Sequence, residues 1–542
     1  MGSSTMTVDT QLDTLEAKGL VRVAAYEPEL EYLFRHALVQ DAAYESLLKQ
    51  ERRALHRTVG EALEELYPDR RAELAAVLAM HFEQAGDTER AVRYAMEAAR
   101  FALERNAIVE AFGLFGRAGA LLPPSSPDED DTTRRRRIEI GLGQARSGFT
   151  FRTPEEGLAA LEPLVPEAER LDDPRMLAEL YVDLALVRQN RGERPESSPE
   201  LAHALARVTE IGEQLDDRAI ISLPKALIGT TQVFTGEIRE GVAALEEAIP
   251  ALEDHHDYVV ASFAMGIRAI GYARLGEFDK AEAAAKRATE VAADGDLIAQ
   301  LDALIAESTV RSTKGDLAGA VPLAQRCTAW SEETGATACM VASNFVLGDA
   351  YMRQGRFEEA QVALERGNEI SAITGFPIFR PSIGAWLRAA AASMGDFGPA
   401  SGKWDEELDA AREMGDRFTE AAILFKRGET RSKALAAGSP ITDIDAVLAD
   451  FSTSASEFDA MGGRPFLART LRAWGDSLRS IGRTGEGDEK LRRALALFEE
   501  MGIDREAAEV RAELSGIAVA PLQMIAPDGA SGTTSGRTPT AT

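Results

Sequence analysis

Small and apolar residues recur at a fixed spacing around a series of glycine turns. The turns read "GDTERA", "GEIREG", "GEFDKA", "GDLAGA", "GRFEEA", "GDFGPA" and "GRTGEG", with their first glycines at Gly86, Gly236, Gly276, Gly315, Gly355, Gly395 and Gly482. From Gly236 to Gly395 the steps are 40, 39, 40 and 40 residues. A fixed period of this size indicates a solenoid of stacked helix pairs, in which the glycine ends the first helix of each pair in a left-handed conformation.

Each unit also places a small residue on both sides of its turn. Five residues after the glycine stand Ala91, Gly241, Ala281, Ala320, Ala360, Ala400 and Gly487. Seven residues before it stand, in most units, Ala79, Gly229, Ala269, Ser308, Gly348 and Gly475. Small side chains at these two positions let the paired helices approach closely. Arg388 breaks the pattern in its unit, so we expect that pair to be splayed or differently registered.

One unit carries a family resemblance. The stretch "NFVLGDAYMRQGRFEEAQVAL" has Leu347, Gly348, Tyr351, Ala360 and Leu364 at the spacing of the tetratricopeptide repeat family, which it resembles, with Asn344 in place of that family's first tryptophan. The resemblance implies an all-α, right-handed helical-hairpin solenoid, here with units of about 40 residues. We expect it to be almost entirely helical from about Gln50 to Leu514.

The amino-terminal residues follow a different pattern. "VDTQLDTLEAKGL" indicates a helix, the alternating "LVRVAAYEPELEYLFRH" a hairpin, and "ALVQDAAYESLLKQERRALHRTVGEALEEL" an amphipathic helix or helix pair. Together they predict a small winged-helix-like cap. The expected organisation is a tag-like start (1–6), this cap (7–58), the first repeats (59–125), the main solenoid (126–515) and a Gly/Ser/Thr-rich disordered tail (516–542).

The cap and first repeats carry a second resemblance. "YLFRHALVQDAAYESLLKQERRALHRTVGEALEELYP", followed by "LAMHFEQAGDTERAVRYAMEAARFAL", resembles a junction found in bacterial signal-transduction ATPases, many of them fused to class III adenylate/guanylate cyclases and others to LuxR-type regulators. The resemblance implies that this chain corresponds to their carboxy-terminal half, either as a fragment or as a stand-alone relative. We find no G-x-x-x-x-G-K-[ST] phosphate loop and no recognisable cyclase domain, so we expect no enzymatic activity, no cofactor and no tight ATP binding.

Composition narrows the classes of partner. Sixty basic and 89 acidic residues give a formal charge of −29, which disfavours binding to nucleic acid or to an anionic membrane. The run "RRRR" at 134–137 follows "PDEDD" and is expected to be a solvated helix start. We see no apolar run long enough to span a bilayer and no signal peptide, and two cysteines, expected to be buried thiols, do not make a disulfide scaffold. These features favour a cytoplasmic location. "EDHHDY" at 253–258 is interpreted as a turn rather than a metal site.

The repeat alignment also predicts a binding surface. Phe345, Asp349, Met352 and Arg353 are expected on the inner, concave side of their helix, and Arg274 and Thr313 hold the place of Arg353 in neighbouring units. Phe345 and Arg353 are expected to be exposed in the unbound chain and to be the best anchors for a partner. Such surfaces bind extended peptides or protein domains, although a merely solvated groove is the alternative. We therefore predict a non-catalytic scaffold or sensor that binds protein or peptide partners and regulates an associated ATPase or nucleotide cyclase, contacting that domain through the amino-terminal segment. The rival function is a small-molecule sensor with a pocket enclosed by the superhelix. An enzyme with an unrecognised site ranks last.

Overall fold

The amino-terminal cap has the predicted order of helix, hairpin and helix pair. The structure is a computed structural model that describes residues 2–26, 30–254, 258–293, 297–398, 402, 404–438 and 443–516, so the expected disorder of the tail and the two histidines of "EDHHDY" lie outside the described residues. The cap contains α1 (Gly2–Ala17), β1 (Val21–Ala25), β2 (Glu31–Phe34), α2 (Ala37–Glu45) and α3 (Lys49–Leu66). The two strands pair antiparallel, with Val21 opposite Phe34.

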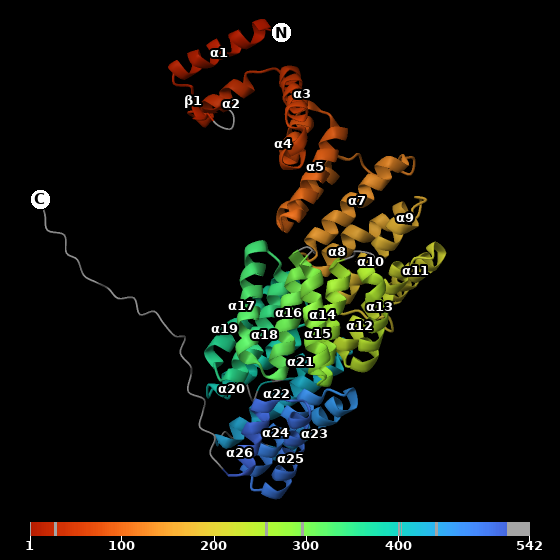
Figure 1. The fold of residues 1–542 in the computed structure, drawn as a ribbon, viewed down its shortest axis with the longest axis vertical. Helices are drawn as coiled ribbons and strands as arrows, with labels where there is room; N and C mark the ends of the chain where they lie inside the picture. Colours follow the sequence, from red (N-terminus) through yellow and green to blue (C-terminus); the bar gives the residue numbers. More distant parts are fainter. Residues whose placement is uncertain are drawn as a thin grey trace, which may run out of the picture.

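Every described element after the cap is helical, as predicted. The first part of the solenoid consists of η1 (Pro68–Arg70), α4 (Arg71–Ala85), α5 (Thr88–Glu104), α6 (Ile108–Leu121), α7 (Asp131–Gly148), α8 (Pro154–Leu161), η2 (Glu162–Leu164), α9 (Val165–Ala168), α10 (Pro174–Asn190) and α11 (Pro199–Leu215). The cap and α4–α6 lie at one end of the elongated molecule, and α8–α11 lie nearer its middle (Figure 1).

The regular units form the middle of the molecule. They comprise α12 (Arg218–Thr235), α13 (Ile238–Asp254), α14 (Tyr258–Leu275), α15 (Phe278–Ala292), α16 (Leu297–Lys314), α17 (Leu317–Thr334), α18 (Thr337–Gln354) and α19 (Phe357–Thr374). All seven turn glycines named above have a positive φ, as the capping interpretation requires. At the α12–α13 crossing, a Cβ on Gly241 would lie 2.6 Å from the carbonyl oxygen of Gly229, so the small-residue seam is confirmed there.

The last units lie at the other end. They comprise α20 (Arg380–Ser393), α21 (Asp405–Glu413), α22 (Arg417–Ala436), α23 (Ile444–Met461), α24 (Arg464–Ser480), α25 (Thr484–Glu500) and α26 (Asp504–Leu514). The irregular pair predicted from Arg388 is α20 and α21. Arg388 donates from Nε to Glu407 Oε1 at 3.0 Å, and α21 has nine residues against eighteen in α19. A charged side chain at the seam therefore coincides with the short, irregular partner helix.

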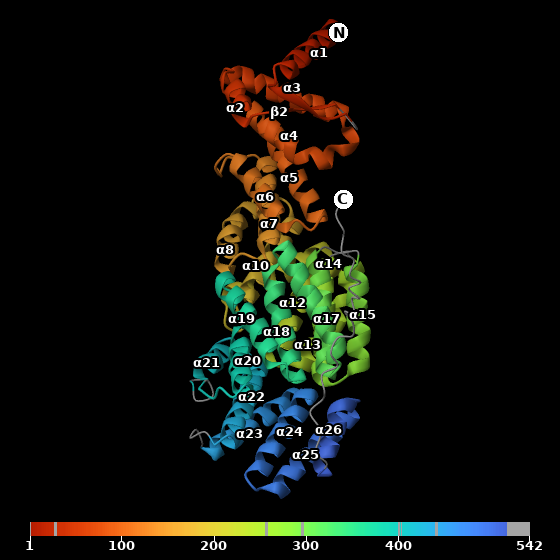
Figure 2. The ribbon, with the colours of Figure 1, turned by 90° about the vertical axis from the view of Figure 1, so that its left-hand side faces the viewer.

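Successive turns of the superhelix stack on each other, so that α22–α26 lie beyond the ends of α12–α18 (Figures 1 and 2). Arg194 Nη1 donates to the carbonyl oxygen of Gly415 at 2.9 Å, across 221 residues of sequence. The turn glycines Gly236 and Gly276 lie against Met461 and Met501, at nearly the same sequence separation. The glycine turns of one superhelical layer thus contact the turns between units of the next layer.

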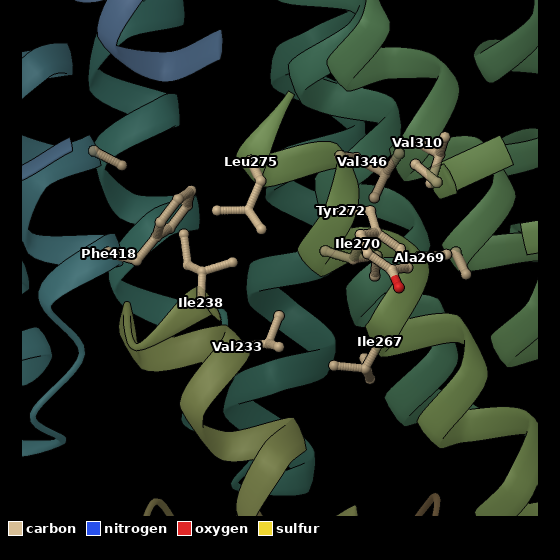
Figure 3. Packing of buried hydrophobic residues seen from close by; sticks show 14 of the residues in the cluster. Val233, Ile238, Ile267, Ala269, Ile270, Tyr272, Leu275, Val310, Val346 and Phe418 are labelled. Carbon is tan, nitrogen blue, oxygen red and sulfur yellow. The ribbon is translucent and has the colours of Figure 1, made fainter. Parts of the chain in front are cut away.

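Apolar packing joins the two layers as well. Phe418 in α22 belongs to the same buried cluster as Ile238 of α13 and Leu275 of α14, and its ring lies beside these two side chains (Figure 3). The core therefore continues from the middle units into the carboxy-terminal units, and the superhelix is closed on itself at this point.

The arginine run differs from its prediction. Arg134 is 5% exposed and donates from Nε to Glu167 Oε2 at 3.0 Å, so the expectation of a solvated helix start is wrong for this residue. Arg137 forms an ion pair of 2.5 Å with Glu129, and Arg135 pairs with Asp173. Acidic residues on both sides of the run, Glu129 before it and Glu167 and Asp173 after it, thus neutralise these three arginines.

Within the described residues, the search for a helix long and apolar enough to cross a bilayer finds none.

Candidate functional site

The structure places the six predicted inner-face residues on the first helices of three consecutive units. Arg274 lies on α14, Thr313 on α16, and Phe345, Asp349, Met352 and Arg353 on α18. None of the six is exposed, because Thr313 and Met352 are buried and the other four are half-buried. The expectation that Phe345 and Arg353 are exposed in the free chain is therefore wrong. Their proposed contact with a partner stays a prediction.

Arg353 is engaged by the chain's own last helices. It donates to the carbonyl oxygen of Ser312, and its Nη2 lies 3.4 Å from Glu506 Oε2 on α26. Arg469 of α24 donates to the same carboxylate at 2.7 and 2.8 Å and to the carbonyl oxygen of Thr313 at 2.7 Å. Burial alone would raise the pKa of Glu506, but the charges of Arg469 and Arg353 outweigh burial and lower it to about 2. This part of the inner face is thus occupied by α24 and α26.

Arg274 lies on α14, the first helix two units before α18, and is held in a similar way. It donates to the carbonyl oxygens of Val233 at 2.7 Å and Phe234 at 3.2 Å, and its guanidinium lies 3.7 Å from the ring centroid of Phe418. Burial lowers the pKa of Arg274 to about 10 and raises the pKa of the nearby Asp416 carboxyl. A cation between an aromatic face and two carbonyl oxygens fixes α14 against α22.

The aromatic end of the predicted surface is an internal cluster. The ring of Phe345 lies 5.8 Å from that of Phe379 and 5.4 Å from that of Trp386, measured between centroids. Trp386 donates from Nε1 to Asp349 Oδ1 at 2.8 Å, and Lys426 Nζ lies 5.0 Å from the Trp386 ring. These contacts join α18, α20 and α22, so Phe345 and Asp349 stabilise the stacking of units.

A different surface carries the exposed apolar side chains. Twelve of the eighteen large apolar side chains exposed in the described part of the chain lie between residues 8 and 66, although this segment is about a ninth of the sequence. We call them the amino-terminal apolar surface: Val8, Leu15, Tyr26, Leu30, Leu33, Phe34, Leu38, Tyr44, Leu48, Leu55, Val59 and Leu66. Among the side chains described in this segment, only Val21 and Gly60 are buried. Large exposed apolar patches mark interaction sites, which makes this segment the candidate docking surface.

Part of the amino-terminal apolar surface is a regular helix stripe. Leu48, Leu55, Val59 and Leu66 follow each other at steps of seven, four and seven residues, which places them on one face of α3. A different face of α3 packs on α4, where a Cβ on Gly60 would lie 2.9 Å from the Phe82 ring. The stripe has the spacing that packs against a partner helix. The stripe was not predicted as a site, although its heptad spacing is visible in the sequence.

A histidine pair joins the cap to the first solenoid helix. His56 Nδ1 and His81 Nδ1 lie 3.0 Å apart, and the Tyr44 hydroxyl lies 3.1 Å from His56 Nε2. Burial lowers the pKa of both imidazoles, and the proximity of His56 adds to the effect on His81. This contact has no spacing signal in the sequence, since the two histidines lie 25 residues apart on different helices.

The cleft between α6, α7, α8 and α10 is small. It has a volume of about 160 Å³ and is lined by apolar rings, including Phe112, Phe149 and Phe376, and by polar groups such as Gln144 and Asn190. Pockets for small organic ligands usually measure about 300–1,000 Å³. This cleft is therefore too small for an organic ligand of that size.

Metal sites and reactive cysteines are the remaining kinds of site to consider among the described residues. No group of three or more His, Cys, Asp or Glu side chains there has an arrangement that would hold a metal ion. Cys327 and Cys339 are both buried free thiols, as predicted, and burial raises the pKa of Cys327 to about 12. A thiol with such a pKa is not a nucleophile at neutral pH.

The comparisons with known proteins agree on repeat class. The tetratricopeptide repeat family model matches residues 341–373, which form α18 and α19. A search of curated protein sequences finds no match.

The similar solved structures have low sequence identity to this chain. A Rap protein crystallised with competence and sporulation factor is 11% identical, with a TM-score of 0.49 over 69% of this chain and 99% of that one. The Cut9–Hcn1 tetramer of the anaphase-promoting complex is 13% identical, with a TM-score of 0.45 over 88% and 92%. A signal-transduction ATPase with a tetratricopeptide repeat sensor from Pyrococcus horikoshii is 14% identical, with a TM-score of 0.33 over 83% and 58%. At these values the likeness carries no information on ligand or activity.

Proposed function

We propose that this chain is a non-catalytic protein-binding scaffold whose partner docks on the amino-terminal apolar surface. The observation that carries the proposal is the concentration of exposed apolar side chains between residues 8 and 66. The predicted inner-face residues Arg274 and Arg353 contact the chain's own carboxy-terminal units instead. A helical segment that covers the α3 stripe would remove Leu55 and Val59, now 51% and 41% exposed, from water.

We further propose that the partner is an ATPase or a nucleotide cyclase that the scaffold regulates. The support is the sequence resemblance of residues 32–68 to the junction of signal-transduction ATPases. The scaffold itself is expected not to bind ATP, since no phosphate loop is recognisable in the sequence. Isothermal titration calorimetry of the intact chain with Mg-ATP checks this, and saturable micromolar binding would contradict it.

The docking surface is tested by cross-linking and affinity capture from the native lysate with three forms of the chain. The first is unchanged, the second carries Leu55→Ser and Val59→Ser, and the control carries Val362→Ser and Ile373→Ser, two exposed side chains of α19. The unchanged chain and the control should capture the same ATPase or cyclase, and the α3 variant should lose it. Equal capture by all three forms would refute the assignment of the surface. Self-association that the α3 variant abolishes would assign the surface to a second copy.

A further inference from the structure

A strip of arginines on the inner face is covered by the acidic side of the last described helix. The arginine strip consists of Arg353 on α18 and Arg469, Arg472 and Arg479 on α24. Glu506, Glu509 and Glu513 of α26 are spaced by three and four residues, so they lie on one face of that helix. Arg353, Arg469 and Arg472 pair with these carboxylates, whereas Arg479 pairs with Asp488 of α25 and reaches only the backbone of α26.

The pairing is specific in geometry. Arg469 holds Glu506 through two donors at 2.7 and 2.8 Å, and Arg353 reaches the same carboxylate at 3.4 Å. Arg472 pairs with Glu509 at 2.7 Å and with Glu513 at 2.5 Å. Arg479 donates to the backbone carbonyl oxygen of Glu513 at 3.1 Å. Two-donor contacts of this kind are how arginine recognises carboxylates.

Apolar burial anchors α26 only weakly. Within its eleven residues it buries Ala507 and Val510, with Ile503 buried just before it. The preceding α25 has seventeen residues and buries Leu491, Ala494 and Phe498. A helix as short as α26 is marginal by itself, so its position depends on its ion pairs with the arginine strip, whose gain is partly offset by lost hydration. Another helix with carboxylates at the same spacing would make the same ion pairs.

We propose that the arginine strip is a binding site for an acidic helical segment of a partner protein, and that α26 occupies this site in the free chain. The segment would carry carboxylates at positions i, i+3 and i+7, as α26 does. Exchange of one acidic helix for another keeps every arginine paired, so no buried cation is left without a counter-charge. This site is separate from the amino-terminal apolar surface and does not depend on it.

The experiment uses the intact chain and a labelled peptide of residues 503–516, "IDREAAEVRAELSG", as the probe. Fluorescence anisotropy measures its binding to the unchanged chain and to a variant with Glu506→Gln, Glu509→Gln and Glu513→Gln. A third form adds Arg469→Gln and Arg472→Gln to that variant. The matched control carries Asp504→Asn and Glu489→Gln, two exposed acids that do not face the strip.

The triple glutamine variant should bind the probe at least tenfold more tightly than the unchanged chain and the control. The added arginine substitutions should reverse this gain, and a probe with its three Glu replaced by Gln should not bind. Equal affinity of the triple variant and the unchanged chain would overturn the proposal, as would binding that survives the arginine substitutions. Hydrogen exchange on the unchanged chain keeps the proposal testable if the variant misfolds: amides of α26 should exchange faster than those of α25, and equal protection would overturn it.

Discussion

Adding one methyl group at the α24–α25 crossing should distinguish the steric effect of the close helix–helix contact from the effect of helix propensity. Gly485 and Gly487 both lie on α25, two residues apart. A Cβ on Gly487 would lie 2.6 Å from the carbonyl oxygen of Gly475 and 2.7 Å from Arg479 Cγ, whereas a Cβ on Gly485 would meet nothing within 4 Å. Gly485→Ala and Gly487→Ala therefore add the same atom to the same helix, one in open space and one against backbone.

The magnitude follows from that difference. Both substitutions gain about 0.5–1 kcal/mol of helix propensity. Gly487→Ala must also push α24 and α25 apart by several tenths of an ångström, which costs about 1–3 kcal/mol in overpacking and lost contact. The free energy of local opening should thus be about 1–3 kcal/mol lower in the Gly487→Ala variant than in the Gly485→Ala variant.

Hydrogen exchange of the α24 and α25 amides measures this quantity, because repeat arrays do not unfold as one two-state unit. Gly485→Ala serves as the control, and its amides should be slightly better protected than those of the unchanged chain. Protection factors that are equal in the two variants would refute the tight seam and with it the register of this unit.

The inner-face contacts and the buried thiol have measurable consequences. Arg353→Ala should lower the free energy of unfolding by about 1–3 kcal/mol, since it removes a donor to Ser312 and a partner of Glu506. Phe345→Ala should lower it by about 3 kcal/mol. Thermal melts like those of the unchanged chain would contradict both. Glu506 has its pKa lowered from 4.5 to about 2, so its contribution is present above pH 4.5 and is lost as pH falls towards 2; Glu506→Gln should flatten the acid limb of stability measured by urea titration between pH 5 and 3. Cys327 should not react with a thiol reagent at pH 8 until urea unfolds the chain, and rapid native labelling would show that the thiol is accessible.

The repeat architecture was predictable because it depends on the spacing of residues that are close in the sequence. A turn glycine such as Gly355, with a small residue on each side of it, defines a helix pair without reference to the rest of the chain. The same reasoning identified Arg388 as the break in the pattern. Glycine conformation and close helix approach depend on residues within one unit, so one sequence suffices for them.

The closure of the superhelix was not predictable in this way. Arg274 and Arg353 look like free cations on a groove until α22, α24 and α26 are placed against them. Those contacts cross more than a hundred residues and depend on the small rotation between successive units, which no single unit encodes. The acidic face of α26 could have been predicted, because Glu506, Glu509 and Glu513 follow each other at steps of three and four residues.

Hydrogen exchange of the intact chain, alone and with the partner captured from the native lysate, tests the central claim most directly. The claim is that the partner docks on the amino-terminal apolar surface rather than on the inner face of α14, α16 and α18. Partner binding should protect amides between residues 8 and 66, above all those of α3, and should leave the exchange of the three inner helices unchanged. Protection confined to α14, α16 and α18, with residues 8–66 exchanging as in the free chain, would contradict it.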